Sequence, residues 1–241
     1  MLTKNHIKLI TSLKQKKFRA QHNLFVVEGI KGIQEFLNSS FELYQLFCVE
    51  DIFNAEFIEI SEKELQRISL LKTPNKALAL FKIPRQSEII ADGLTIALDD
   101  VRDPGNLGTI IRLCDWFGIK NLICSKATVD CYNPKVVQAT MGSLTRVTIK
   151  YVDLVSYIND YDKTVFGTFM DGDNIYEQSL PAEGLIVLGN EANGISSAIE
   201  DLVTQRIAIP RFGNLKATES LNVATATAIV LSEFKRIATE K

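Results

Sequence analysis

Residues 98–118 read LDDVRDPGNLGTIIRLCDWFG, and this stretch decides the fold because a strand is expected to turn into a helix there. The apolar run LTIAL at 94–98 predicts a buried strand, and Pro104-Gly105 is typical of a turn. A helix is expected over 109–117, where apolar residues recur at helical spacing: Ile110, Leu113, Cys114 and Phe117.

This transition carries a polar cluster. Asn106 is expected in the turn and Arg112 on the first turns of the helix, with Gly108 between them. Backbone N–H groups and the positive end of the helix dipole point out of such a turn. A phosphate or carboxylate ligand would fit there.

The remainder of the carboxyl-terminal half repeats the pattern of apolar runs separated by helical stretches. Strands are expected at 121–124, 146–151, 164–169, 185–189 and 206–210. Strands that alternate with helices predict an α/β fold with a mostly parallel sheet covered on both faces. In such sheets ligands bind beyond the carboxyl ends of the strands.

Two more polar loops follow strands of this sheet. The second loop, residues 188–196 (LGNEANGIS), has Glu191 as its sole charge. The third runs from Ile209 and Pro210 to the SLNV segment at 220–223, before an expected last helix over 224–236. Taken alone, Ser220 could simply cap that helix, but three polar loops at one sheet edge favour a shared site.

The amino-terminal part predicts a separate small α/β domain. Strands are expected at 24–29, 44–50, 57–60 and 77–82, with helices at 30–37 and after Ser61, which has the capping-box spacing to Glu64. The predicted organisation is therefore a basic arm or helix at 1–22, the small domain at 23–82, a linker at 83–93 and a second domain at 94–241.

The first 27 residues contain no acidic side chain, whereas the whole chain has a net charge of only −2. Any nucleic-acid contact must therefore be local. A short amphipathic helix is expected over 6–19, and its basic residues form either a solvated face or an RNA-binding arm. Four of them are the RNA-binding candidates: Lys14, Lys16, Lys17 and Arg19.

Several classes of function are disfavoured by what the sequence lacks. It has neither GxGxxG nor GxxxxGK[ST], which disfavours a nicotinamide enzyme, a P-loop NTPase and a protein that binds some other nucleotide on this fold. Both histidines precede residue 23, which excludes a His-based triad or a His-rich metal site in the second domain. Four cysteines without a CxxC pair, and no signal peptide or membrane span, predict a soluble, reduced, cytoplasmic protein with no metal and no membrane partner.

At this point the chain resembles a known family. Asn106, Gly108 and Arg112 (NxGxxxR), the GNExxGxS pattern at 189–196 and the IP…SLNVA run ending at Ala224 look like the three ordered motifs of SpoU/TrmH-type RNA 2′-O-ribose methyltransferases, of the SPOUT superfamily. The segment at 14–37 looks like the small substrate-binding domain that often precedes the catalytic one.

The resemblance implies a carboxyl-terminal trefoil knot, a homodimer whose sites use both subunits, and S-adenosyl-L-methionine as the cofactor. It implies rRNA or tRNA as the partner. The cofactor-binding candidates are Thr168, Leu188, Gly189, Ile209, Pro210 and Leu221.

The resemblance also marks Arg112 as catalytic. Moving an arginine pKa from about 12.5 to 7 would cost roughly 7 kcal/mol, so we expect Arg112 to clamp a phosphate and stabilise the developing alkoxide rather than act as the base. Asn106 would orient Arg112 or the ribose, and Glu191 would pair with the arginine or a substrate hydroxyl. Ser220 and Asn222 would complete the pocket.

Two departures from the family pattern stand out. Ala192-Asn193 stands after Glu191 where relatives more usually have a glycine. In addition, six residues lie between Gly213 and Ser220 where relatives commonly have about three, with Arg211 in place of an apolar residue. A longer, more basic loop near the cofactor would affect the choice of RNA. The alternative function is a catalytically inactive RNA-binding module of the same fold.

Overall fold

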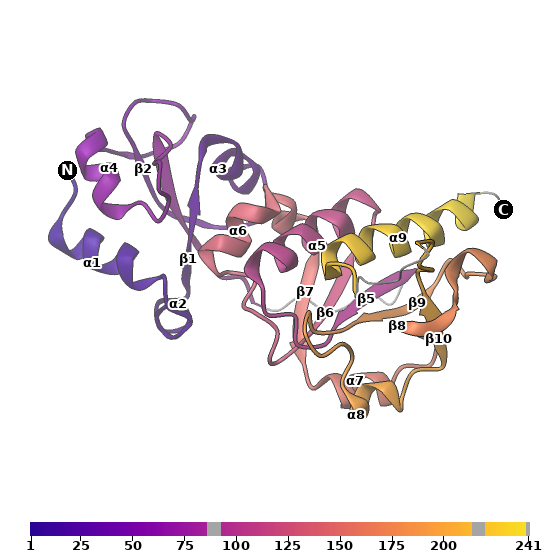
Figure 1. The fold of residues 1–241 in the computed structure, drawn as a ribbon. Coiled ribbons are helices and arrows are strands. Elements are labelled where there is room, and N and C mark those ends of the chain that lie inside the picture. The colour runs from indigo at the N-terminus through magenta and orange to yellow at the C-terminus, as the bar shows by residue number, and fades with distance from the viewer. Residues whose placement is uncertain (86–92, 214–219, 240–241) are drawn as a thin grey trace. The chain divides into compact units, whose positions relative to one another are not determined.

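A computed structural model describes residues 1–85, 93–213 and 220–239. The chain divides into two compact units (Figure 1). The first unit is Met1–Gln86 with Asp130–Thr145, and the second is Ser87–Val129 with Arg146–Lys241. The segment Asp130–Thr145, predicted as part of the second domain, therefore packs with the amino-terminal residues.

The first unit is a four-stranded sheet with helices on both faces. Its sheet order is β1-β4-β2-β3, antiparallel except for the β2–β3 pair. The elements are α1 (Lys4–Ser12), α2 (Lys16–His22), β1 (Leu24–Glu28), α3 (Ile30–Leu37), β2 (Leu43–Cys48), β3 (Ile58–Glu59), α4 (Glu62–Ile68), β4 (Ala77–Lys82), α6 (Pro134–Thr140) and the 3-10 turn η1 (Ser143–Thr145).

Strand β1 shows how the two faces are filled, because its side chains alternate between them. Leu24 and Val26 join a buried cluster with residues of α1 and α4. Phe25 points the other way, where its ring lies 5.5 Å from Phe36 of α3 and 4.8 Å from Tyr132, just before α6. The segment containing α6 thus completes the core of the first unit.

The helix predicted over 6–19 is two helices, so that prediction was wrong. The chain breaks between Ser12 and Lys16, where Arg19 donates from Nη1 to the carbonyls of Leu13 and Lys14 at 2.7 and 3.0 Å. Those carbonyls bind a side chain instead of continuing the α-helical ladder. The predicted capping box of Ser61 and Glu64 is confirmed at the start of α4.

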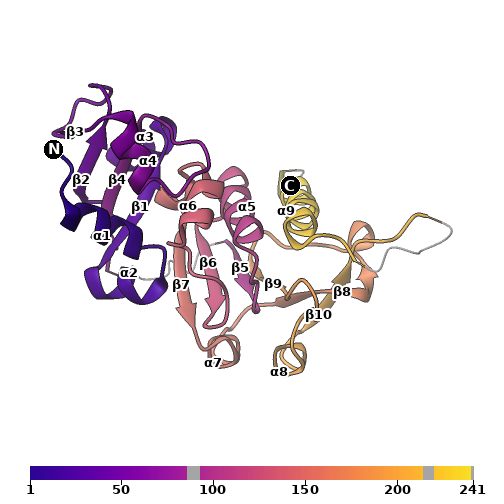
Figure 2. The same ribbon diagram turned by 60° about the vertical axis from the view of Figure 1, so that its left-hand side comes forward.

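The second unit is a six-stranded sheet of order β10-β8-β9-β5-β6-β7, in which every pair is parallel. Helices α5 and α9 cover one face and α7 and α8 the other (Figures 1 and 2). The elements are β5 (Leu94–Leu98), α5 (Pro104–Trp116), β6 (Asn121–Ser125), β7 (Thr148–Val152), α7 (Leu154–Asn159), β8 (Val165–Asn174), the 3-10 turn η2 (Ile175–Glu177), β9 (Gly184–Leu188), α8 (Ser197–Glu200), β10 (Gln205–Ala208) and α9 (Val223–Thr239).

Helix α5 begins earlier than the sequence predicted. Pro104 occupies its first position, where a missing N–H costs nothing, and the Asp103 side chain caps it by accepting from Asn106 N–H at 2.8 Å. Asn106 therefore lies on the first helical turn rather than in a preceding turn. This start is at the carboxyl end of β5, as the parallel sheet requires.

The mostly parallel fold with a small preceding domain is confirmed, and the trefoil knot stays a prediction.

Helix α9 packs on the sheet through Phe234, whose ring meets Phe166 of β8 edge-on at 5.1 Å. Cys48, Cys114, Cys124 and Cys131 are buried free thiols. Within the described ranges, no helix has the length and apolar character needed to cross a bilayer.

Candidate functional site

The three polar loops meet at one end of the second unit through a chain of side-chain hydrogen bonds. Asn106, on α5, donates from Nδ2 to Glu191 Oε1 at 3.0 Å. Asn222, before α9, donates from its own Nδ2 to Asn106 Oδ1 at 2.9 Å. One residue from each predicted motif is therefore fixed to the next, although 85 and 116 positions separate the bonded pairs along the chain.

Glu191 holds the loop before α5 in place. Its carboxylate also accepts from the backbone N–H groups of Arg102 and Asp103, each at 3.2 Å. Burial raises the pKa of Glu191, but hydrogen bonds from Asn106 and from backbone N–H groups outweigh it and hold the pKa below its ordinary value. Glu191 is thus an ionised acceptor. Of the two partners predicted for it, Arg112 or a substrate hydroxyl, the arginine is not its partner within the chain, because Asn106 takes that place.

Asn222 links the cluster to the start of α9. Its Oδ1 accepts from the N–H groups of Ala224 and Thr225 at 3.0 and 3.2 Å, which is the geometry of a helix cap. Because Oδ1 is occupied in this way, Nδ2 must face Asn106. The capping role considered for Ser220 belongs to Asn222.

The second loop folds back on itself just after β9. Asn190 and Gly194 exchange two backbone hydrogen bonds at 2.9 Å, and Asn190 donates from its side chain to the carbonyl of Asp100 at 2.7 Å. A Cβ on Gly189 would lie 2.1 Å from the carbonyl carbon of Gly194, so only glycine allows this approach. These contacts within the chain fix the path of the loop.

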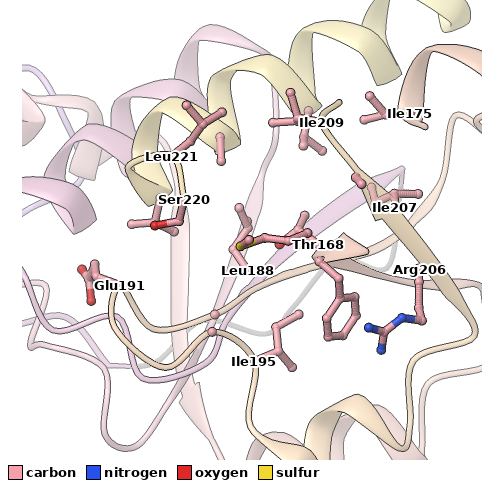
Figure 3. A pocket seen from close by; sticks show the side chains of 18 of the residues that line it. Thr168, Ile175, Leu188, Glu191, Ile195, Arg206, Ile207, Ile209, Ser220 and Leu221 are labelled. Carbon is pink, nitrogen blue, oxygen red and sulfur yellow. The ribbon is translucent and has the colours of Figure 1, made fainter. Parts of the chain in front are cut away.

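Beside this cluster lies a cavity of about 1130 Å³, formed by the ends of β8, β9 and β10 and the start of α9. In Figure 3, Glu191 and Ser220 lie at one end of the cavity and Arg206 at the other. Glu191 and Ser220 line the cavity. The six cofactor-binding candidates line it as well: Thr168, Leu188, Gly189, Ile209, Pro210 and Leu221.

The residues of this cavity fit S-adenosylmethionine. The cavity volume lies just above the range of about 300–1000 Å³ usual for small-molecule sites, so a molecule of this size can enter. Its walls are mainly apolar, which suits an adenine ring, and Gly189 is among the residues that line it. Leu221 is 49% exposed, so this wall has apolar surface available to a ligand.

Sequence reasoning missed the far end of the cavity. The Arg206 guanidinium stacks on the Phe169 ring at 3.6 Å from its centroid and pairs with Asp171 and Glu200. Asp171 and Glu200 raise the pKa of Arg206 above its ordinary value. No local motif marks these residues, because β8 and β10 become neighbours only in the folded sheet.

Arg112 lies outside the hydrogen-bonded cluster. Six positions separate it from Asn106, which corresponds to about 9 Å along an ideal helix and about 120° around it. It is exposed, does not line the cavity, and makes no hydrogen bond or ion pair within the part of the chain that is described. The structure therefore leaves this guanidinium available to a ligand.

The basic arm divides into two kinds of residue. Lys14, Lys16 and Lys17 are exposed, as an RNA-binding role requires. Arg19 is only 2% exposed and donates to Asp130 from Nε at 3.0 Å and from Nη2. The prediction that Arg19 binds RNA is therefore withdrawn, because its donors are used inside the first unit.

Two further expectations concern the longer loop between Gly213 and Ser220 and the absence of a metal site. Residues 214–219, which make up the longer loop predicted between Gly213 and Ser220, lie outside the described residues. Across the described ranges, no cluster of three or more His, Cys, Asp or Glu side chains could hold a metal ion.

Comparison with known proteins places these features in a family. Residues 93–232 match the model of the SpoU rRNA methylase family, and residues 4–79 match the MRM3-like substrate binding domain. The chain is 27% identical over 234 residues to the 23S rRNA (guanosine(2553)-2′-O)-methyltransferase RlmP of Bacillus subtilis, covering 92% of this chain and 93% of the relative.

Two solved structures extend the likeness to the whole fold. A TrmH-family protein from Porphyromonas gingivalis is 39% identical with a TM-score of 0.87, covering 98% of this chain and 99% of that one. The AdoMet-bound rRNA methyltransferase of Sinorhizobium meliloti is 29% identical with a TM-score of 0.87, covering 98% and 96% of the two chains.

Proposed function

We propose that this chain, which belongs to the SpoU rRNA methylase family, methylates a ribose 2′-hydroxyl of ribosomal RNA with S-adenosylmethionine as the methyl donor. The cofactor supplies an electrophilic methyl group on a sulfonium. The single observation that carries the proposal is the hydrogen-bonded chain from Glu191 through Asn106 to Asn222, which fixes three distant motifs beside one large cavity.

Within the site, the cavity walls bind the cofactor and exclude water. Thr168, Leu188 and Leu221 would contact it, and Asn106 would orient the ribose, because Glu191 and Asn222 fix both ends of its amide. Glu191 is a positioning residue in this scheme. It holds Asn106 and the amino-terminal end of α5 rather than touching the substrate.

Arg112 would act in the site of a second copy of the chain. Trp116 lies one helical turn beyond Arg112 on the same face of α5 and is 84% exposed, and large exposed apolar side chains mark interfaces. A homodimer that covers Trp116 would carry Arg112 toward the partner's cavity. There the guanidinium would hold the phosphate of the target nucleotide and stabilise the developing alkoxide.

The first unit would supply affinity for RNA. It contains the match to the MRM3-like substrate binding domain, and Lys14, Lys16 and Lys17 are exposed on it. Such contacts to phosphate bind RNA without reading its sequence. The alternative of an inactive module finds no support, since the motif residues are intact and interlocked.

The test is a methyl-transfer assay with the purified chain, labelled S-adenosylmethionine and rRNA from cells that lack the protein. We expect one 2′-O-methyl site to appear, and mapping that site identifies the target nucleotide. Binding of S-adenosylmethionine without transfer to any RNA would favour the inactive module. Absence of cofactor binding would refute methyl transfer and favour the inactive RNA-binding module.

A further inference from the structure

The first unit contains a cavity of its own, away from the site described above. Its volume is about 220 Å³, below the range of about 300–1000 Å³ for drug-sized ligands and suited to a single small ring system. Most of its walls are apolar: Val26, Leu70, Leu71, Pro134, Val137 and Ala139. These residues come from β1, the loop after α4, and α6.

One carboxylate lines this apolar cavity. Glu28, at the end of β1, accepts from Ser69 Oγ at 2.5 Å through Oε2 and from Leu70 N–H at 2.7 Å through Oε1. An ionised carboxylate has about four lone-pair positions, so one remains on each oxygen. Two adjacent acceptor positions are therefore available to a ligand with two adjacent donors.

The carboxylate is held firmly but is poorly solvated. Burial raises the pKa of Glu28 above its ordinary value, while Ser69, Leu70 and the positive charge of Lys14 act in the opposite direction. A ligand that donates hydrogen bonds to this carboxylate would replace solvation lost on folding. This supports the argument from geometry, which rests on the cavity itself.

Basic and polar side chains surround the opening. Lys135 and Gln138 are exposed and line the cavity from α6. The charge of Lys14 reaches Glu28, and the backbone of Lys14 is fixed by Arg19, which also binds Asp130 four residues before α6. One lysine thus lines the cavity, and the positive charge of a second acts on its carboxylate.

We propose that this cavity binds one unstacked guanine base of the RNA, whose N1–H and N2–H groups donate to the two oxygens of Glu28. Lys135 and Lys14 would contact the adjoining phosphates, and the apolar walls would contact the ring faces. The inference rests on the proposed function, because it concerns how the first unit holds that RNA substrate.

Guanine fits Glu28 better than the other bases. It alone presents two adjacent donors on its Watson–Crick edge, whereas adenine and cytosine place an acceptor beside their amino group and uracil flanks its one donor with acceptors. An acceptor facing the carboxylate would be repelled and left unpaired in an apolar pocket. RNA recognition commonly relies on splayed bases read in this way.

The test measures binding of two five-nucleotide RNAs, UUGUU and the same RNA with inosine in place of guanosine. Inosine lacks only the N2 amino group. We expect wild-type protein to prefer guanosine by about tenfold to a hundredfold, as for loss of one charge-assisted hydrogen bond. Glu28→Gln should reduce the preference to less than about twofold, and the matched control Glu56→Gln, which alters an exposed carboxylate of the same unit, should keep it.

Ala139→Leu provides a second variant that leaves Glu28 intact and fills the cavity from α6. It should weaken binding of UUGUU about tenfold, toward the affinity of the inosine RNA. Equal binding of both RNAs by wild-type protein, or no binding of either, would overturn the guanine pocket. Methyl transfer to rRNA, measured in parallel, separates the two ideas: if it persists without a guanosine preference, only this inference fails.

Discussion

Two arginines that looked alike in the sequence have opposite environments in the structure. Arg19, in the first unit, is 2% exposed and its guanidinium binds Asp130 and the carbonyls of Leu13 and Lys14. Arg112, in the second unit, is exposed and has no hydrogen-bond partner among the described residues. A buried cation that donates four hydrogen bonds within its own unit stabilises the fold, and an exposed one whose donors are unused is available to a ligand.

Of the substitutions considered, the largest effect on the free energy of unfolding is expected at Arg19. Arg19→Ala leaves Asp130 without its cation and two carbonyls without their donor, so the free energy of unfolding should fall by about 3 kcal/mol. Urea unfolding followed by circular dichroism measures this. Arg19→Lys should recover little, because a lysine lacks the planar fork of donors.

The control for Arg19 is Lys17→Ala, which removes an exposed cation from the same helix. Its free energy of unfolding should stay within about 0.5 kcal/mol of wild type. If Arg19→Ala were as stable as Lys17→Ala, the structural role of Arg19 would be wrong.

Arg112 should give the next largest effect, on activity alone. Arg112→Ala should lower kcat/KM for RNA by about a hundredfold, which is about 2.7 kcal/mol of lost transition-state stabilisation. Thermal stability and affinity for S-adenosylmethionine should not change, because Arg112 contacts neither the core nor the cavity. Arg67→Ala, an exposed arginine of α4, serves as the control and should leave kcat/KM unaltered.

Mixing two impaired variants tests whether Arg112 acts in the partner's site. One chain carries Arg112→Ala and the other Asn106→Asp, so a mixed dimer contains one site with both residues intact only if the arginine crosses between subunits. Mixing equal amounts should then restore about a quarter of wild-type activity. No recovery would mean that Arg112 serves its own chain.

The elements of the second unit could be predicted from sequence because their patterns are local. The apolar run at 94–98 is β5, and the strand before each polar loop falls where alternation of strands and helices predicts it. Residues that follow parallel strands share one sheet edge, which is why Asn106, Glu191 and Asn222 could be grouped before their hydrogen bonds were known.

The rest depended on contacts between distant residues. Nothing near Arg19 in the sequence indicates Asp130, 111 positions away, so its burial could not be predicted. Arg206 and Phe169 meet only because β10 pairs with β8. The Pro104-Gly105 pair predicts a turn when it is considered alone. In the structure it begins α5, because the Asp103 side chain caps the helix at this point.

Asn106, unlike Arg112, belongs to the hydrogen-bonded part of the site. In the wild-type chain, Asn106 Nδ2 lies 3.0 Å from Glu191 Oε1. Asn106→Asp places a second carboxylate there, and repulsion between the two carboxylates should displace the amino-terminal end of α5. We expect about a tenfold loss of kcat/KM. The double variant Asn106→Asp with Glu191→Gln restores one donor and one acceptor to the contact and should recover most of the activity.

Failure of that rescue would contradict a positioning role for Glu191. If the double variant stayed as slow as Glu191→Gln combined with Asn106→Ala, the carboxylate of Glu191 would have to act directly on the substrate. Affinity for S-adenosylmethionine, measured by titration calorimetry, should remain within about twofold of wild type in the rescued protein.

The three exposed lysines of the arm should affect RNA binding through charge. Replacing Lys14, Lys16 and Lys17 together by glutamine should reduce the slope of log affinity against log salt by about 2, as expected for three lost phosphate contacts on single-stranded RNA. Stability should be retained, in contrast to Arg19→Ala. An unchanged slope, measured by fluorescence anisotropy with rRNA fragments, would exclude the arm from the RNA interface.

The smallest effect concerns acid stability at Glu191. Its pKa is below the ordinary value of 4.5 in the folded chain, so its contribution to the free energy of unfolding is complete above pH 4.5 and is lost as the pH falls through the lowered pKa. Because the carboxylate is largely exposed, the contribution should be less than about 1 kcal/mol. The thermal unfolding temperatures of wild type and Glu191→Gln should therefore differ at pH 7 and converge below pH 4. The control Glu56→Gln should match wild type at every pH. A difference between wild type and Glu191→Gln that stays constant across this range would mean that the ionised form of Glu191 does not hold the loop.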